Sequence, residues 1–153
     1  MAYCVDTSAW LDGWQRFYPP DVFPTLWTKI EEIVEAGEII SSEEVYVELA
    51  QKSDDLHTWM KARKGMLIPL EPDIQQRAAD ILTTYPRLVD TLRGRSKADP
   101  FVIATAMERN AIVVTGEILT GKLTKPRIPD VCQAMNVRWL GFLQMIRELN
   151  LKF

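Results

Sequence analysis

The order of residue patterns predicts an α/β protein, a three-layer α/β/α sandwich around a central, mainly parallel sheet of four to five strands. Short apolar runs rich in β-branched residues alternate with longer stretches whose apolar residues recur every three to four positions. The clearest run, 111–114, is apolar at every position, as expected for a strand that helices cover on both faces. This alternation of strands and helices therefore indicates parallel strands joined by helical crossovers.

The elements follow one another along the whole chain without an internal repeat or a linker, which predicts a single domain over residues 1–153. The expected strands cover 2–5, 38–40, 111–114 and 137–140, and residues 66–70 form an apolar connector. The expected helices cover 7–17, 24–36, 41 onward, 53–64, 73–85, 100–109, 131–135 and 141–149.

Helix boundaries are indicated by capping residues. Thr7 or Ser8 is expected to cap the first helix. Asp99 occupies the expected N-cap position of the helix in which Pro100 is the first residue, where the missing N–H of proline costs nothing. Asn110 is the expected left-handed residue that ends this helix.

Two glutamates in the stretch SSEEVYVEL compete for a functional role. Ser41 and Glu44 match the S-x-x-E capping box, which gives Glu44 a structural role at the helix start. Glu48 lies one turn further along on the same face, beside the apolar residues Val45 and Leu49. Because no local role is assigned to Glu48, we favour it over Glu44 as an active-site acid.

Acidic residues stand where parallel strands end or helices begin. Asp6 directly follows the first strand, and Glu117 follows the strand 111–114. Functional residues in parallel sheets gather outside the carboxyl ends of the strands. We therefore expect Asp6, Asp99 and Glu117 to converge, although each also has a structural interpretation as a turn residue, a helix cap or a solvated loop residue.

Converging carboxylates indicate a metal site. Acids held together repel one another and raise one another's pKa, a cost that a divalent cation removes. Carboxylates without a partner His or Cys are hard oxygen ligands, which suits Mg²⁺ or Mn²⁺ rather than Zn²⁺. Such an ion can activate water and neutralise charge on a phosphodiester.

Two loops concentrate positive charge. Arg93, Arg95 and Lys97 precede Asp99, where they form either a solvated turn or a phosphate-binding edge beside the acids. A second basic loop, 121–129, carries Lys122, Lys125 and Arg127 around a proline. Both loops are local features, because the net charge of −3 excludes a generally basic nucleic-acid binder.

Composition points to a cytoplasmic protein with a well-developed core. The chain has 153 residues, 47% of them hydrophobic, and only two cysteines, which we expect to be reduced. No apolar run approaches a membrane span, and no basic segment followed by an apolar run marks a signal peptide.

Trp10 and Trp14 lie four positions apart, on one face of the first expected helix. They form either a stacking platform for nucleobases or part of a packed core or dimer interface. We favour packing.

Three stretches resemble the PIN-domain family of nucleases, which includes many bacterial and archaeal toxins. They are VDTSAW at 5–10, SSEEVYVEL at 41–49 and ADPFVIATAMERNAIVVTGE at 98–117, in the order found in that family. By this resemblance Asp6, Glu48 and Asp99 correspond to metal-binding acids. Thr115 corresponds to the hydroxyl residue after the fourth strand.

The resemblance implies a metal-dependent endoribonuclease that uses Mg²⁺ or Mn²⁺, with a fold that often forms a homodimer. It also implies that the protein is the toxin of a toxin–antitoxin pair, with RNA as substrate and an antitoxin protein as partner. A PIN-fold RNA- or protein-binding module with weakened catalysis is the alternative. Another α/β enzyme such as a phosphatase is disfavoured, because the sequence has no nucleophile motif or glycine-rich phosphate loop.

The chain departs from the family at Glu117, where Asp is usual. The longer side chain favours contact with the ion through a bound water, although we still count Glu117 among the metal-site acids. Asp130, in the stretch KPRIPDVC, is the alternative fourth acid.

Overall fold

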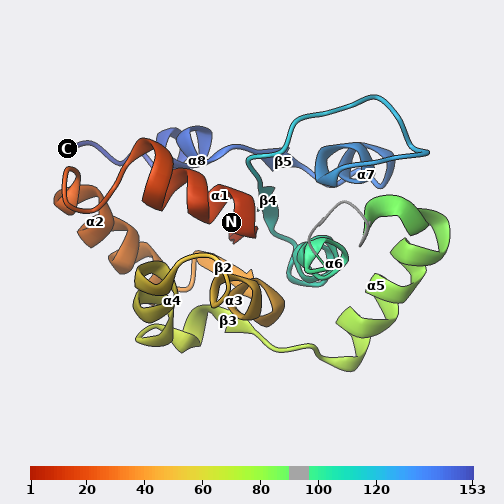
Figure 1. Cartoon of the computed structure of the whole chain (residues 1–153), viewed down its shortest axis with the longest axis horizontal. Helices are drawn as coiled ribbons and strands as arrows, with labels where there is room; N and C mark the ends of the chain where they lie inside the picture. Colours follow the sequence, from red (N-terminus) through yellow and green to blue (C-terminus); the bar gives the residue numbers. More distant parts are fainter. Residues whose placement is uncertain (90–96) are drawn as a thin grey trace.

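The computed structural model describes residues 1–89 and 97–153 and confirms the three-layer α/β/α sandwich (Figure 1). Within these residues every strand pairing of the central sheet is parallel. The sheet has the order β3-β2-β1-β4-β5. Its strands are β1 (Tyr3–Val5), β2 (Ile39–Ser42), β3 (Leu67–Ile68), β4 (Ile112–Val114) and β5 (Trp139–Leu140).

The strand order reverses direction between β1 and β4. The chain passes from β1 to β2 and β3 on one side, and then crosses to β4 and β5 on the other side. The register pairs Cys4 with Val113 and Val5 with Val114, so the two strands end level with each other. Open α/β sheets bind ligands at such a switch point, outside the carboxyl ends of the strands.

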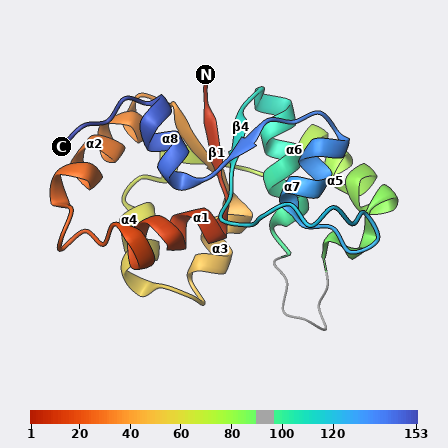
Figure 2. The ribbon, with the colours of Figure 1, turned by 90° about the horizontal axis from the view of Figure 1, so that it is seen from above.

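Helices cover both faces of the sheet (Figure 2). One layer contains α1, α2, α4 and α8, and the other contains α5, α6 and α7. The helices are α1 (Thr7–Leu11), α2 (Pro24–Glu35), α3 (Glu43–Leu49), α4 (Asp54–Lys61), α5 (Pro72–Thr84), α6 (Asp99–Arg109), α7 (Ile128–Ala134) and α8 (Phe142–Glu148). Two short 3₁₀ turns, Lys64–Met66 and Pro86–Leu88, complete the described elements together with a π-helix, Asp12–Phe17.

The core confirms the packing interpretation of the two tryptophans. Trp10 is fully buried, and its ring lies 6.3 Å from the ring of Trp27 and 5.7 Å from that of Trp59, centroid to centroid. Trp14 meets the same two rings at 4.8 and 5.9 Å. Trp10 also donates a 2.8 Å hydrogen bond from its indole nitrogen to Ser41 Oγ. The four tryptophans therefore hold α1, α2 and α4 together.

The capping predictions were wrong at three helix starts. Asp6, rather than Thr7 or Ser8, caps α1, because its carboxylate accepts a hydrogen bond from Ala9 N. Ala98 is the N-cap of α6, so Asp99 is already the first helical residue.

At α3 the cap is Ser42, whose hydroxyl accepts a 3.2 Å bond from Glu44 N. Ser41 does not serve there, because its buried hydroxyl donates to Val5 O instead. The end of α6 agrees with the prediction, because Asn110 adopts a left-handed conformation with φ of 52°.

Two segments have a different secondary structure from the one that the sequence predicts. The apolar connector 66–70 contains the edge strand β3, which pairs with Ser41 and Ser42 of β2. The first expected helix divides into α1 and the π-helix that begins at Asp12. Within the π-helix a Cβ atom on Gly13 would lie 2.5 Å from the ring of Phe142, so glycine is required for this close approach.

None of the helices that the structure describes is both long and apolar enough to cross a lipid bilayer.

Candidate functional site

Asp6 lies at the switch point of the sheet, directly after β1. Its side chain is only 2% exposed, and one carboxylate oxygen accepts a 2.7 Å hydrogen bond from Ala9 N. The same carboxylate accepts 2.9 Å bonds from the hydroxyl of Ser8. The backbone of α1 therefore fixes the carboxylate at the carboxyl end of the sheet.

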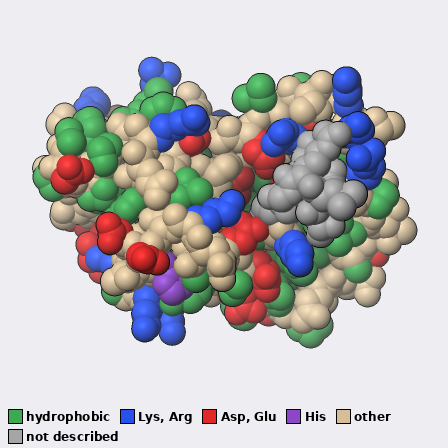
Figure 3. Space-filling view, in the orientation of Figure 1, with side chains coloured by type: hydrophobic (Ala, Val, Ile, Leu, Met, Phe, Trp, Pro, Cys, Tyr) green, Lys and Arg blue, Asp and Glu red, His purple; other side chains and the backbone are tan. Residues whose placement is uncertain are grey.

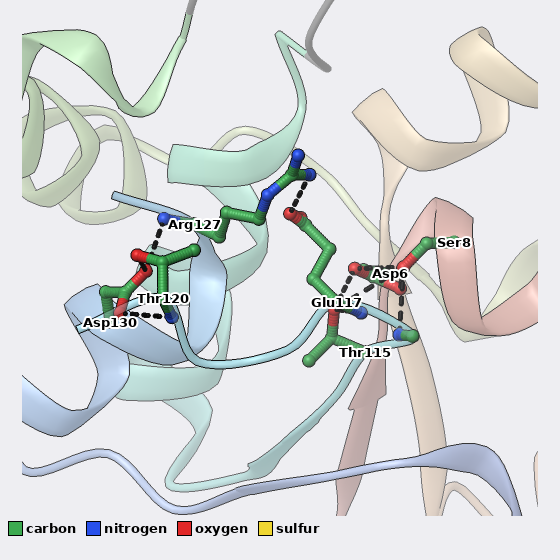
Figure 4. Close-up of polar contacts among 8 residues, drawn as sticks. Asp6, Ser8, Thr115, Glu117, Thr120, Arg127 and Asp130 are labelled. Carbon is green, nitrogen blue, oxygen red and sulfur yellow. Dashed lines mark hydrogen bonds and ion pairs between the residues drawn. The ribbon is translucent and has the colours of Figure 1, made fainter. Parts of the chain in front are cut away.

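Thr115, which follows β4, completes the surroundings of Asp6 (Figure 4). Its hydroxyl donates a 2.6 Å hydrogen bond to Asp6 Oδ2 and accepts a 3.1 Å bond from Glu117 N. Ser8 reaches the same segment, because its hydroxyl accepts a 2.9 Å bond from Gly116 N. Two hydroxyl groups thus join the loop after β4 to the start of α1.

Burial changes the proton affinity of Asp6. Loss of hydration is the largest cause and raises the pKa of Asp6 from 3.8 to about 7. Hydrogen bonds from Thr115, Ala9 and Ser8 favour the charged form, whereas the negative charge of Glu117 disfavours it. Burial therefore favours the protonated form of Asp6, and a nearby cation would favour its ionised form.

Glu48 accepts hydrogen bonds from the residues next to two other predicted acids, Asp6 and Asp99. Its carboxylate accepts a 2.6 Å bond from the hydroxyl of Thr7, the residue after Asp6. It also accepts a 3.3 Å bond from the backbone nitrogen of Ala98, the residue before Asp99. Asp99 itself is 6% exposed, at the start of α6. The structure therefore brings the chain at Asp6, Glu48 and Asp99 together at one end of the sheet.

Glu117 lies between this group and a basic side chain. Its carboxylate is 3.6 Å from the guanidinium of Arg127, the residue before α7. Figure 4 shows Glu117 between Arg127 on one side and Asp6 and Thr115 on the other. The charge of Glu117 contributes to the raised pKa of Asp6, so the two carboxylates interact.

Asp130, the alternative fourth acid, has a structural role. Its carboxylate accepts bonds of 2.9 and 2.6 Å from the Thr120 nitrogen and hydroxyl, and bonds of 2.8 Å from the Gly121 and Arg127 nitrogens. Burial alone would raise the pKa of Asp130, but these bonds outweigh it and lower the pKa. In Figure 4 Asp130 and Thr120 form a separate group from Asp6. Asp130 therefore holds the loop before α7 in place.

Sequence reasoning missed Ser8 and Asp12. A Cβ atom on Gly116 would lie 2.3 Å from Asp12 Oδ2 and 3.3 Å from Ser8 Oγ, so both side chains press against this glycine. Burial raises the pKa of Asp12, and the neighbouring Arg16 opposes the rise. Ser8 belongs to the stretch VDTSAW, so the resemblance to the PIN-domain family could have identified it. The approach of Asp12 to Gly116 spans more than 100 positions and has no local signal.

The donor atoms at this edge suit a hard cation. Asp6, Glu48, Asp99 and Glu117 offer carboxylate oxygens, and the only histidine of the sequence stacks on Tyr46 with ring centroids 4.2 Å apart. These oxygen atoms are of the chemical type that Mg²⁺ and Mn²⁺ prefer as ligands. Among residues 1–89 and 97–153, no group of three or more His, Cys, Asp or Glu side chains is arranged to hold a metal ion.

A cavity of about 510 Å³ opens beside the loop after β4. Asp12, Thr115 and Glu117 contribute to its polar wall. The aromatic side chains of Tyr18, Trp139 and Phe142 contribute to its apolar wall. Its size is in the range of small-ligand sites, and its position places aromatic surface next to Asp12 and Glu117.

The predicted RNA-binding residues lie partly outside what the structure describes. Lys97 is exposed, two residues before Asp99, whereas Arg93 and Arg95 fall outside the described residues. Acidic and basic side chains are interspersed over the face drawn in Figure 3. This distribution agrees with the small net charge of −3.

The fold is similar to that of a chain in the crystal structure of VapBC2 from Rickettsia felis, bound to a DNA fragment from their promoter. The TM-score is 0.58 at 14% sequence identity, over 92% of this chain and 98% of that chain. This similarity confirms the PIN-like fold. A chain of VapBC-1 from nontypeable Haemophilus influenzae aligns with a TM-score of 0.46 at 16% identity, over 94% of this chain and 99% of that one.

No curated protein matches the sequence. Residues 3–153 match the model of a family described as a domain of unknown function, DUF4411. The match spans the site from Asp6 onward as well as the sheet and its helices. The chain therefore belongs to the DUF4411 family.

Proposed function

We propose that the protein is a metal-dependent endoribonuclease that hydrolyses single-stranded RNA. The hydrogen bond between Thr115 and Asp6 is the observation that carries this proposal. The bond acts on a buried carboxylate, whose pKa is raised by loss of hydration, at the switch point where parallel sheets bind their ligands. Glu48 and Asp99 lie at the same end of the sheet, so the site gathers acids rather than a nucleophile and its base.

Asp6, Glu48 and Asp99 would hold Mg²⁺ or Mn²⁺, with Glu117 contacting it through water. When bound, the ion supplies polarisation of the phosphodiester and activation of the attacking water. Residues of the chain itself orient the carboxylates of Asp6 and Glu48. Ser8 and Thr115 hold the Asp6 carboxylate from two sides, and Thr7 and the Ala98 nitrogen hold Glu48.

The cavity that Thr115 and Glu117 help to line supports RNA as the substrate class. Its aromatic wall offers unpaired nucleobases a stacking surface, and stacking contributes about 1–3 kcal/mol per base in proteins that bind single strands. Asp12 and Glu117, the acids among its lining residues, would then face the backbone of the bound strand. Double-stranded RNA hides its bases within the helix, so we expect single strands to be preferred.

An RNA cleavage assay tests the proposal. Purified protein should cut a mixed set of end-labelled single-stranded RNAs with Mg²⁺ or Mn²⁺, but not with EDTA. Asp6→Asn should lower the cleavage rate by at least about 100-fold. Asp21→Asn is the matched control, because Asp21 is exposed in a turn before α2 and should leave the rate unchanged. Cleavage that persists in EDTA or in Asp6→Asn would exclude this mechanism.

We further propose that the protein acts as the toxin of a toxin–antitoxin pair and forms a homodimer. The support is its resemblance to the PIN-domain toxins and its likeness of fold to a chain of the VapBC2 structure. Induced expression in a bacterial host should arrest growth, whereas Asp6→Asn at equal protein level should not. Co-expression of the protein encoded by the adjacent gene should restore growth, and light scattering measures the oligomer.

A second candidate is a PIN-fold binding module with weakened catalysis. The contact between Glu117 and Arg127 favours it, because a carboxylate that neutralises an arginine is a poorer metal ligand. This candidate predicts RNA or protein binding without cleavage under any divalent ion. The cleavage assay, run beside a binding measurement, separates the two.

A further inference from the structure

The Arg127 side chain reaches from the start of α7 to the acidic site. Its guanidinium lies 3.6 Å from the carboxylate of Glu117, and Figure 4 shows this pair on the side of Asp6 that faces α7. The side chain of Arg127 is 43% exposed, while that of Glu117 is 16% exposed. The cation is thus held beside the acids and remains accessible from solvent.

Stability does not account for this arrangement. A partly exposed pair at 3.6 Å is longer than a hydrogen bond, and such pairs typically contribute only about 0–1 kcal/mol to folding. Guanidinium has five N–H donors in a planar fork that matches the oxygens of a phosphate. Among residues 1–89 and 97–153, the contact with Glu117 uses a small part of that capacity.

The backbone beneath Arg127 is fixed by Asp130. The buried Asp130 carboxylate accepts a 2.8 Å bond from Arg127 N, and it also bonds to the nitrogens of Thr120 and Gly121. These bonds join the segment after β4 to the start of α7. The base of the arginine side chain is therefore positioned, and binding would require only its outer part to reorient.

We propose that Arg127 binds a phosphate of the RNA strand at the Asp6 site, and that Glu117 holds the guanidinium there until RNA arrives. The inference rests on the proposed function, because it names the group that receives the substrate of that site. Carboxylates repel a polyanion, so a site built from Asp6, Glu48 and Asp99 gains from a positioned cation beside it. Arg127 is then a substrate-binding residue, and Asp130 is its positioning residue.

Binding measured without cleavage tests the inference independently of catalysis. Fluorescence anisotropy of a labelled single-stranded RNA, in EDTA and over 50–200 mM salt, gives the Kd and its salt dependence. Arg127→Ala should weaken binding about 10-fold or more, and should reduce the log–log salt slope by about 0.7, the value for one phosphate contact on a single strand. Thermal unfolding should show that the variant remains folded.

Two variants with the same change in charge serve as controls. Lys122→Ala removes an exposed cation from the same loop. Arg138→Ala breaks another arginine–glutamate pair, the hydrogen-bonded pair with Glu148, at the opposite end of the sheet, because Arg138 precedes β5. Both should change binding less than Arg127→Ala does. Arg127→Lys keeps the charge but loses the planar fork of N–H donors. Compared with Arg127→Ala, it should restore the salt slope but only part of the affinity for RNA.

A double-mutant cycle tests the role of Glu117. If Glu117 competes with the phosphate for Arg127, Glu117→Gln should tighten RNA binding in the wild-type background by more than it does with Arg127→Ala. Equal effects of Glu117→Gln in the two backgrounds would show only general repulsion between Glu117 and RNA. That result would exclude competition between Glu117 and the phosphate for Arg127.

The result that overturns the phosphate site is an Arg127→Ala variant with unchanged Kd and salt slope. If that variant also cleaves RNA at the wild-type rate, the proposed ribonuclease stands and the inference alone fails. If the wild-type protein binds RNA through Arg127 but never cleaves it, the inference stands and the catalytic function fails.

Discussion

The hydroxyl of Thr115 donates a 2.6 Å hydrogen bond to Asp6 Oδ2 and so joins the ends of two adjacent parallel strands. The two residues are 109 positions apart, and both are nearly inaccessible to solvent. Because the register brings Val5 level with Val114, each residue is the first to leave its strand at the switch point. This bond ties the orientation of the central acid to the position of the loop after β4.

Replacing Thr115 with Val tests that relationship. Valine keeps the shape and burial of the side chain but removes the donor to Asp6 and the acceptor for Glu117 N. We expect RNA cleavage to fall about 10- to 100-fold, as is typical when a residue that orients a metal ligand is lost. Thr83→Val, at an exposed position of α5, is the control and should leave the rate unchanged. A wild-type rate in Thr115→Val would contradict a role for this bond in catalysis.

The pKa of Asp6 predicts a dependence of stability on pH. Burial raises that pKa to about 7, whereas in the unfolded chain the group ionises near 3.8. Between these values the folded state binds more protons than the unfolded state, so the free energy of unfolding falls as pH rises and levels off above about 7. Asn at this position does not ionise.

Without divalent ions, we therefore expect Asp6→Asn to be more stable than the wild type at pH 8, by an amount that shrinks toward pH 4. The difference should be on the order of 1 kcal/mol, seen as about 2–4 °C in Tm. Adding Mg²⁺ or Mn²⁺ should raise the Tm of the wild type but not of Asp6→Asn, because only a ligand that binds the folded state stabilises it. A pH-independent difference between the two proteins would refute the raised pKa.

Substitution of Glu117 should lower the rate of RNA cleavage, whereas substitution of Asp130 should mainly lower the stability of the fold. Glu117→Gln should reduce cleavage by about 10- to 100-fold, less than Asp6→Asn, because we place Glu117 in contact with the ion through water. Glu35→Gln, at an exposed position of α2, should have no effect. Cleavage that survives Glu117→Gln intact but disappears with Asp130→Asn would reverse the assignment.

Asp130→Ala should act mainly on stability. It removes the acceptor for the nitrogens of Thr120, Gly121 and Arg127, so we expect a loss of about 2–3 kcal/mol in urea unfolding. The pKa of Asp130 is lowered, so its contribution is present above the usual range of a carboxylate and is lost as pH falls through the lowered value. The variant and the wild type should therefore converge in stability at low pH, and a constant gap would argue against this role.

A side chain at Gly116 is predicted to displace the residues packed around it. A Cβ atom there would lie 2.3 Å from Asp12 Oδ2, so Gly116→Ala must displace Asp12, Ser8 or the loop that carries Thr115. We expect cleavage to fall by at least about 10-fold. Gly65→Ala is the matched control, since a Cβ atom at Gly65 has no atom within 4 Å among the residues that the structure describes. Equal cleavage rates of Gly116→Ala and Gly65→Ala would show that the loop after β4 accommodates a side chain without loss of activity.

The sequence by itself determined the class of fold and the place of Asp6 directly after the first strand. Apolar periodicity and β-branched runs locate most strands and helices, because burial on one or two faces leaves a direct pattern in the sequence. Asn110 could be predicted for a local reason, the low cost of a left-handed conformation at a helix end. Asp6 and Glu117 could be placed at the sheet edge because parallel strands share one carboxyl end.

Tertiary structure alone decided which neighbours those residues have. Asp6 rather than Thr7 caps α1, Ser42 rather than Ser41 caps α3, and the connector at 66–70 supplies an edge strand. The choice of cap depends on where the strand before it ends, and strand pairing with a distant segment sets that point.

The contacts that distinguish the acids from one another also come from packing. Asp130 is occupied by four donors from its own loop, Glu117 faces Arg127, and Asp12 presses on Gly116. A sequence shows that an acid is present but not which donors or charges surround it. Those surroundings form only when segments far apart in the chain pack together, and they decide whether a carboxylate holds a loop or is available to a ligand.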